Sequence, residues 1–154
     1  MVYRRLMAAL AATGVVGGAH VPDASAKAPV GRFTVIQNSN GVVVYDATLN
    51  RTWQRATGMK DCTWATAKNY CSGLQLQGGG WRLPDLRELQ SLVDFKEPPP
   101  TIDKSAFPDT PVDMLWTSTA YQPAATGLRW AVHFNYGSSL QQSMNNPRAV
   151  RCVR

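Results

Sequence analysis

Residues 78–92 of the chain read GGGWRLPDLRELQSL, and this stretch decides how the rest of the sequence is interpreted. The three glycines indicate a loop, because glycine adopts backbone conformations that are closed to other residues. Pro84 fixes its own φ angle and biases Leu83 towards an extended conformation. Asp85 and Glu88 stand three residues apart, which is the spacing of a helix N-cap and its reciprocal partner. The stretch therefore predicts an extended segment that turns directly into a helix.

Two helices are predicted, one on each side of the glycine loop. The second begins after Asp85 and ends near Asp94, with apolar residues at helical spacing along one face. The first covers residues 63–74, where Thr63 can cap the start and one stripe is formed by Trp64, Ala67, Cys71 and Leu74. Both helices therefore have one side to bury.

The stretch around Pro84 also carries a specific signature, formed by Trp81, Arg82, Leu83, Pro84 and Glu88. Together with residues 64–71, 102–108, 115–119 and 150–154, this signature resembles the Lcl C-terminal domain family, which takes its name from the Legionella collagen-like adhesin. The resemblance runs from about residue 42 to the end of the chain. It implies a fold similar to C-type lectin-like domains and to the sulfatase-modifying, formylglycine-generating enzymes. Such a fold is α+β, with two helices, an irregular antiparallel sheet and long loops.

Several strands are predicted around these helices. Residues 32–36 and 41–45 are rich in β-forming side chains and are separated by a turn-forming cluster, so they read as a hairpin. Later strands are expected over residues 115–119, 129–136, 139–144 and 149–154, the last of which closes the chain. Three consecutive prolines begin at Pro98, so residues 97–113 are expected to form a long loop.

The first 26 residues have the pattern of a secretory signal peptide. Two arginines precede an apolar run over residues 6–19, and Ala24-Ser25-Ala26 supplies a small-residue cleavage pattern. The run is short and interrupted by glycines, which argues against a membrane anchor. We expect an exported protein, in the periplasm, at the cell surface or outside the cell. The chain then divides into a signal peptide (1–26), a tether with the first strand (27–40) and one domain (41–154).

Composition indicates which class of protein this is, and the net charge indicates which kind of partner it could bind. Hydrophobic residues make up 44% of the 154 residues and charged residues 17%, as in a globular domain. The formal net charge is +6, and removal of the signal peptide, with two arginines and one aspartate, leaves +5. This excess favours acidic partners, but it forms no basic tail, so nucleic acid is not an expected partner. No membrane span is expected after the signal peptide.

Three cysteines remain in the exported chain, an odd number for an oxidising compartment. The sequence by itself does not fix their pairing. The resemblance to C-type lectin-like folds implies a bridge between the first helix and the final strand, here Cys71–Cys152. Cys62 is then left over, either free, paired with another chain or competing for a partner.

No catalytic or metal-binding constellation is found in the sequence. His133 is the only histidine after the signal peptide, and we expect it on a solvated sheet face with Ala131 and Asn135. A calcium-loop spacing that begins at Asp46 lacks the glycine and the final glutamate of that loop. The formylglycine-generating enzymes use a late cysteine pair, whereas only Cys152 is present here. We expect neither an enzyme nor a bound cofactor or metal.

A surface hypothesis remains. The adhesin of the resembled family recognises sulfated glycosaminoglycans, and a basic face is the physical requirement for that. The candidates for such an acidic-ligand patch are Arg129, Arg148, Arg55 and Lys60, if the final strands are neighbours. The alternative is that the basic side chains are dispersed over the surface as solvated charges and form no patch, and that Arg82 and Arg151 have partly structural roles. We predict a non-catalytic binding module for acidic polysaccharide or a cell-surface partner. One alternative is a structural or protein-interaction domain without a glycan ligand. The other is an uncharacterised enzyme of the formylglycine-generating fold.

Overall fold

The computed structural model describes residues 31–122 and 127–154. The predicted signal peptide and the start of the tether lie outside the described residues. The regular elements are β1 (Phe33–Asn38), β2 (Gly41–Asp46), β3 (Arg51–Gln54), α1 (Trp64–Gly73), α2 (Leu86–Gln90), β4 (Met114–Ala120), β5 (Leu128–His133) and β6 (Ser138–Ser143). Two helices and two antiparallel three-stranded sheets make the described chain an α+β protein, as the sequence predicts.

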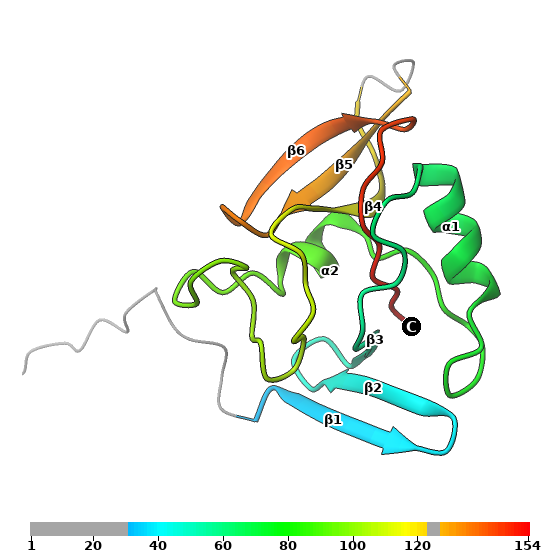
Figure 1. Cartoon of the computed structure of the whole chain (residues 1–154), viewed down its shortest axis with the longest axis vertical. Helices are drawn as coiled ribbons and strands as arrows, with labels where there is room; N and C mark the ends of the chain where they lie inside the picture. Colours follow the sequence, from blue (N-terminus) through cyan, green and yellow to red (C-terminus); the bar gives the residue numbers. More distant parts are fainter. Residues whose placement is uncertain (1–30, 123–126) are drawn as a thin grey trace, which may run out of the picture.

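The two sheets lie at opposite ends of the molecule (Figure 1). Their strand orders are β1-β2-β3 and β4-β5-β6, so each is a simple meander. Helix α1 lies beside the second sheet, and the last residues of the chain run from that sheet towards the first (Figure 1). The predicted single irregular sheet is therefore two separate sheets joined by the C-terminal segment.

Both predicted helices are present, and their starts follow the sequence signals. Thr63 is the N-cap of α1, and its side chain accepts a hydrogen bond from the Thr66 N–H. Asp85 and Glu88 form the complete capping box of α2, with side-chain to backbone distances of 2.8 and 2.9 Å. However, α2 ends at Gln90 and not near Asp94. The helix is cut short because the backbone of the following residues pairs with the long loop, where Asp94 donates to the Thr101 carbonyl.

The C-terminal segment is not the regular strand that was expected over residues 149–154. Its backbone instead forms isolated bridges with several elements: Ala149 pairs with Leu115, and Val153 pairs with both Trp53 and Arg82. The Cys71–Cys152 disulfide fixes the same segment to α1, as the resemblance implied. The segment therefore joins β3, β4, α1 and the signature turn, and it cannot follow one partner for its whole length.

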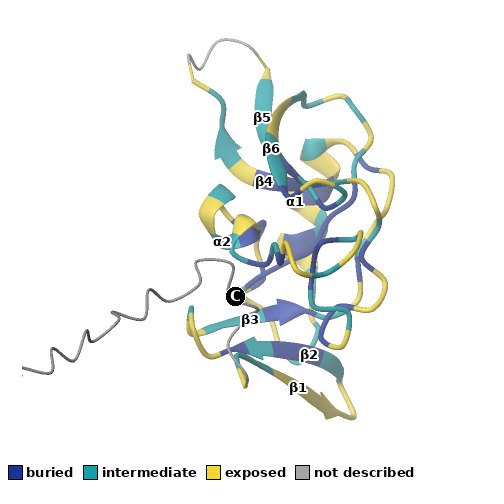
Figure 2. Ribbon diagram, turned by 90° about the vertical axis from the view of Figure 1, so that its left-hand side faces the viewer, coloured by how far each residue is buried: buried dark blue, intermediate teal, exposed yellow. Residues whose placement is uncertain are grey.

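The second sheet is covered on both faces. Leu115 and Val132 belong to one hydrophobic cluster, while Trp116 and Ala131 belong to a second cluster with the disulfide. The prediction that Ala131 shares a solvated face with His133 is wrong, because Ala131 is fully buried against this second cluster. Figure 2 shows the buried residues concentrated in the middle of the molecule, with β1 exposed at its edge.

The predicted long loop is irregular and buries two large side chains, Ile102 and Phe107. Phe107 is fully buried and packs edge-to-face on Phe33, with the ring centroids 5.2 Å apart. The loop therefore covers the core between the sheets. In the part of the chain that the structure describes, no helix has the length and apolar character to cross a membrane.

Candidate functional site

Strand β5 and helix α1 meet at an aromatic side chain that carries two cations. The guanidinium carbon of Arg129 lies 4.4 Å from the ring centroid of Trp64, and the Lys68 ammonium lies 5.6 Å from the same centroid. The indole N–H of Trp64 donates to the carbonyl oxygen of Thr117 in β4 at 2.8 Å, which fixes the ring. Lys68 reaches the ring because it follows Trp64 by four residues on α1, which is about one helical turn.

Gln142 in β6 brings a third cation to the same place. It is the cross-strand partner of Arg129, and directly opposite residues in an antiparallel pair point their side chains to the same face. Arg148 donates to the Gln142 Oε1 at 2.8 Å. The backbone of Arg148 is itself fixed, because its N–H and C=O both bond to Cys62. We call Trp64, Lys68, Arg129, Gln142 and Arg148 the Trp64 site.

The cations of the Trp64 site form no ion pair with any described carboxylate. By contrast, ion pairs are formed by Arg32, Arg51, Arg82, Lys104 and Arg151. The Nε atoms of Arg129 and Arg148 are also buried without a hydrogen-bond acceptor in residues 31–122 and 127–154. The described chain thus gathers three positive charges here and does not neutralise them.

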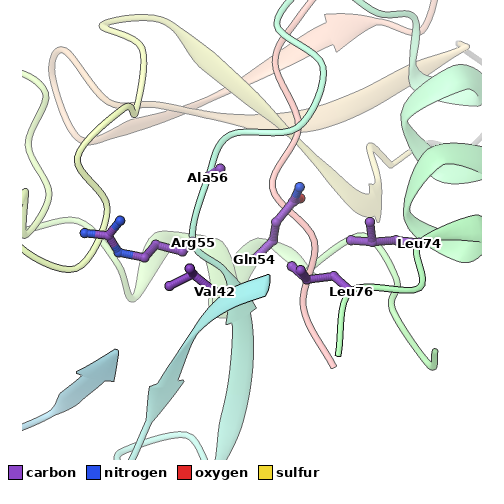
Figure 3. Close-up of a pocket in the computed structure, with 6 residues that line it drawn as sticks. All are labelled: Val42, Gln54, Arg55, Ala56, Leu74 and Leu76. Atoms are coloured by element: carbon purple, nitrogen blue, oxygen red, sulfur yellow. The ribbon is translucent and has the colours of Figure 1, made fainter. Parts of the chain in front are cut away.

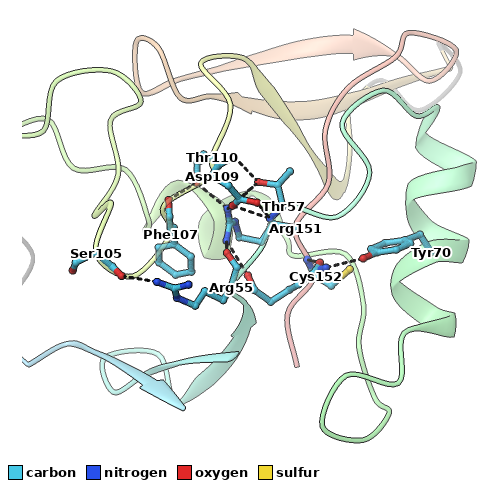
Figure 4. A network of polar contacts seen from close by, with 10 residues as sticks. Arg55, Thr57, Tyr70, Ser105, Phe107, Asp109, Thr110, Arg151 and Cys152 are labelled. Carbon is cyan, nitrogen blue, oxygen red and sulfur yellow. Dashed lines mark hydrogen bonds and ion pairs between the residues drawn. The ribbon is translucent and has the colours of Figure 1, made fainter. Parts of the chain in front are cut away.

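Arg55, which was predicted to join the same patch, lies elsewhere. Its guanidinium points away from α1 and donates to the Ser105 carbonyl in the long loop at 3.3 Å (Figure 4). The reason is the direction of the chain after β3, which carries Arg55 towards that loop. Lys60 is exposed and lies two residues before Cys62, whose backbone pairs with Arg148. The structure therefore brings Arg129 and Arg148 together, adds Lys68, and separates Arg55 from them.

Arg151 has a structural role, which was the alternative to a place in the acidic-ligand patch. Its side chain is 0% exposed, and its guanidinium donates to the Gln54 carbonyl and to the Thr110 hydroxyl, both at 2.8 Å. Asp109 lies 3.7 Å away and Phe107 stacks below at 4.6 Å (Figure 4). Burial lowers the pKa of Arg151 to about 10, although the charge of Asp109 acts in the opposite direction. Arg151 therefore ties the C-terminal segment to β3 and to the long loop.

The signature residues also have structural roles. Glu88 receives a two-point contact from Arg82, at 2.6 and 2.8 Å, and a third bond from Arg51 at 3.1 Å. The hydrogen bonds from Arg82 lower the pKa of Glu88 to about 2, although burial opposes this change. Trp81 is buried, and its indole N–H donates to two carbonyls of the preceding loop. The signature thus fixes the turn into α2 and is separate from the Trp64 site.

A pocket of 330 Å³ lies beside β3 and the loop that follows α1 (Figure 3). Its lining is mainly apolar and consists of Val42, Gln54, Arg55, Ala56, Leu74 and Leu76. The Gln54 side chain is already engaged, since its Nε2 donates to the Tyr70 hydroxyl at 2.7 Å and its Oε1 accepts from the Cys152 N–H. The Arg55 guanidinium points away from the two leucines (Figure 3). The pocket therefore presents few polar groups to a ligand.

Cys62 is the cysteine left outside the disulfide, and it is a free, buried thiol. Its Sγ donates to the Arg148 carbonyl at 3.2 Å. Burial, and after it the charge of Asp61, raises the pKa of this thiol. The thiol thus contacts the backbone of Arg148, one of the residues of the Trp64 site.

The described residues contain no group of three or more histidine, cysteine or acidic side chains arranged to hold a metal. His133 is half-buried; its Nδ1 accepts from the Asn135 N–H at 3.1 Å, and its ring lies 5.1 Å from that of Tyr136. Asp46, where the calcium-like spacing begins, is fully buried and accepts two bonds from Arg32 at 2.7 and 3.0 Å. Both residues are therefore engaged in contacts of the fold.

Comparison with known proteins supports the interpretation of the signature. Residues 42–154 match the model of the Lcl C-terminal domain. No curated protein matches the chain. The match covers both helices, all the residues of the Trp64 site and both sheets apart from β1 and the first residue of β2. The chain belongs to the Lcl C-terminal domain family.

Proposed function

We propose that this protein is an exported, non-catalytic module that binds acidic polysaccharide through the Trp64 site. One observation carries the proposal: Arg129, Arg148 and Lys68 converge on Trp64 and Gln142, and no described carboxylate pairs with them. Uncompensated cations on one surface attract a polyanion and raise its local concentration.

The geometry of the site suits sulfate or carboxylate groups. Guanidinium groups bind such anions through two parallel N–H donors, which a lysine cannot do. Arg129 is held by the Trp64 ring and Arg148 by Gln142, so both side chains are already ordered before a ligand arrives. Ordering them beforehand lowers the entropy that binding costs.

Export is supported by the disulfide and by the family. Disulfides persist mainly in oxidising compartments, and Cys71–Cys152 closes a loop between residues 81 positions apart. The Lcl family and the signal-peptide pattern of residues 1–26 agree with an extracytoplasmic location. We also propose that the arrangement of two helices and two small sheets is a variant of the C-type lectin-like fold.

A second candidate function is binding of a protein partner. Phe95 is 76% exposed and Tyr136 is 69% exposed, which is unusual for large aromatic side chains. They lie near one another, because the Phe95 ring packs against Gly137, the residue after Tyr136. Exposed aromatic side chains are typical of protein interfaces. Binding to this aromatic surface does not depend on salt concentration as binding to a cationic site does. The salt dependence of binding therefore distinguishes the two candidates.

Retention on a heparin column across a salt gradient tests the proposal. A neutral glycan column serves as the matched control for non-ionic sugar contacts. We expect retention on heparin beyond that of an unrelated protein of equal net charge, and no retention on the neutral glycan. Elution of the protein together with the charge-matched reference would contradict the proposal and make a protein partner the better search.

A further inference from the structure

Strand β1 forms an open edge of the first sheet. The other edge is closed, because Thr52 of β3 bonds to Arg154 in both directions and the Gln54 N–H donates to the Cys152 carbonyl. Within residues 31–122 and 127–154, β1 pairs with β2 alone. One row of backbone donors and acceptors is therefore left without a strand partner, and such a row is a template for pairing with another chain.

The register of the β1–β2 hairpin shows which backbone groups point outward. Asn38 stands opposite Gly41 across a two-residue turn, and at the far end of the ladder the Ala47 N–H donates to the Arg32 carbonyl at 2.9 Å. Hydrogen-bonded and non-hydrogen-bonded pairs alternate in an antiparallel ladder, so the even-numbered residues of β1 bond to β2. The residues that direct their N–H and C=O groups away from the sheet are Phe33, Val35 and Gln37.

Strand β1 lacks the features that usually protect an edge strand. Its sequence, FTVIQN, has no charged residue and no proline, and its register with β2 contains no bulge. Arg32 does not supply a charge to the edge, because it is bound to Asp46 and to the Ser91 carbonyl. Val35 and Ile36 are 44% and 42% exposed, and successive strand residues point to opposite faces. Pairing would thus cover apolar side chains on both faces.

We propose that β1 pairs with β1 of a second copy of this chain, antiparallel, about a twofold axis at Val35. In this register Val35 faces the partner's Val35, and Phe33 faces the partner's Gln37. Every outward N–H then meets a carbonyl of the other copy, because the three outward residues are evenly spaced about the axis. The absence of charge along β1 means that no like charges meet across the axis.

The size and closure of this contact define the assembly. Pairing through one short strand gives a small interface, so the dimer is reversible and concentration-dependent. Through this sheet the assembly closes at two copies, since the outer side of β3 is occupied by the C-terminal segment. If the proposed polysaccharide function also holds, the dimer carries two Trp64 sites and gains avidity on a repeating polymer. The dimer itself does not depend on that function.

Sedimentation velocity on the exported protein, purified in its processed form, tests the pairing. We expect the sedimentation coefficient of the wild-type protein to rise from a monomer to a dimer value between micromolar and millimolar concentration. Val35→Lys and Val35→Glu each place like charges face to face at the axis, and each should weaken self-association by about tenfold or more. An equimolar mixture of the two variants should restore the dimer, because opposite charges then meet.

Leu140→Lys is the matched control, since it adds the same charge to an exposed apolar position on strand β6. It should leave self-association unchanged. A wild-type protein that stays monomeric over the whole range would overturn the proposal, whatever the variants do. Two charged Val35 variants that associate as the wild type does would also overturn it, and would place any dimer on a different surface.

Discussion

Arg129 lies over the indole ring of Trp64 at 4.4 Å, and this contact joins β5 to α1 on the surface of the molecule. The indole N–H, at the edge of the ring, donates to the Thr117 carbonyl in β4, so the ring is fixed by two strands of one sheet. Arg129 is thereby held in one position although no described carboxylate pairs with it. A cation that is positioned by a ring and not by an acid keeps its charge available to a ligand.

Replacement of Trp64 tests this positioning. A cation–π contact at an exposed site contributes about 0.5–1 kcal/mol, so Trp64→Leu should weaken binding of a sulfated polysaccharide by roughly two- to fivefold. Trp64→Phe keeps an aromatic face and should retain more of the affinity. Both variants lose the indole donor to Thr117, so their difference isolates the ring. Isothermal titration at one salt concentration measures it, and equal losses in both would argue against the cation–π role.

The disulfide is expected to be a major source of stability. Cross-linking residues 81 positions apart contributes about 4 kcal/mol in the chain-entropy model, and the Cys71→Ala/Cys152→Ala variant should lose that amount. Urea unfolding of the variant and of the wild type, each with and without reductant, measures the loss. The reductant should affect the wild type alone. A bridge that includes Cys62 in peptide mapping would contradict the assignment.

Removal of Arg151 should destabilise the fold strongly. Arg151→Met leaves two buried acceptors, the Gln54 carbonyl and the Thr110 hydroxyl, without the donor that they share, which we expect to cost about 2–5 kcal/mol. If that variant does not accumulate, Thr110→Val removes the bond from Arg151 and the bond to the Phe107 carbonyl, and should cost about 1–2 kcal/mol. Urea unfolding measures both. An unchanged midpoint in Thr110→Val would show that the network contributes little.

Glu88 should make stability depend on acidic pH. Its pKa in the folded protein is lowered to about 2 from an ordinary value of 4.5, chiefly by hydrogen bonds from Arg82. Because its pKa is lower in the folded protein, Glu88 contributes its full share to the free energy of unfolding above pH 4.5. This contribution is lost as the pH falls towards 2. Because Arg82 is half-exposed, solvent screening reduces this contribution to about 1–2 kcal/mol.

The Glu88→Gln variant provides the comparison for this pH dependence. The difference in unfolding free energy between wild type and variant should shrink as the pH falls from 4.5 to 2. Asp46 also has a lowered pKa: burial acts to raise it, but the hydrogen bonds and charge of Arg32, together with the backbone N–H groups of Thr48 and Leu49, lower it further, so the variant retains some pH dependence. Parallel curves for the two proteins over this range would rule out the role of Glu88.

Local signals in the sequence predicted the helix starts, whereas the ends of elements depended on contacts with distant segments. The Asp85–Glu88 capping box needs only neighbouring residues, and it is present. The apolar spacing through Leu92 and Val93 predicted a longer helix, but Val93 pairs with Ile102 in the long loop. Residues 149–154 were likewise predicted as one final strand, whereas Val153 pairs with both Trp53 and Arg82 and Ala149 pairs with Leu115. The sequence of a segment does not show how many distant partners its backbone has.

The candidate site was predicted in part for the same reason. Arg129 and Arg148 were named because the last strands were expected to be neighbours, and Gln142 connects them. Arg55 was grouped with them on charge alone, whereas its direction depends on the course of the chain after β3. Lys68 was missed, although its four-residue spacing from Trp64 on a predicted helix was a usable signal.

The affinity for a heparin fragment, measured at several salt concentrations, tests the central claim most directly. The site variant is Arg129→Gln/Arg148→Gln, and the control is Arg87→Gln/Lys96→Gln, which removes two exposed charges outside the Trp64 site. We predict that the site variant binds at least about tenfold more weakly and that its salt dependence falls by about two counterions, one for each lost contact. The control should stay close to the wild type. Equal losses in both variants would show that net charge alone governs binding, and would contradict the assignment of the Trp64 site.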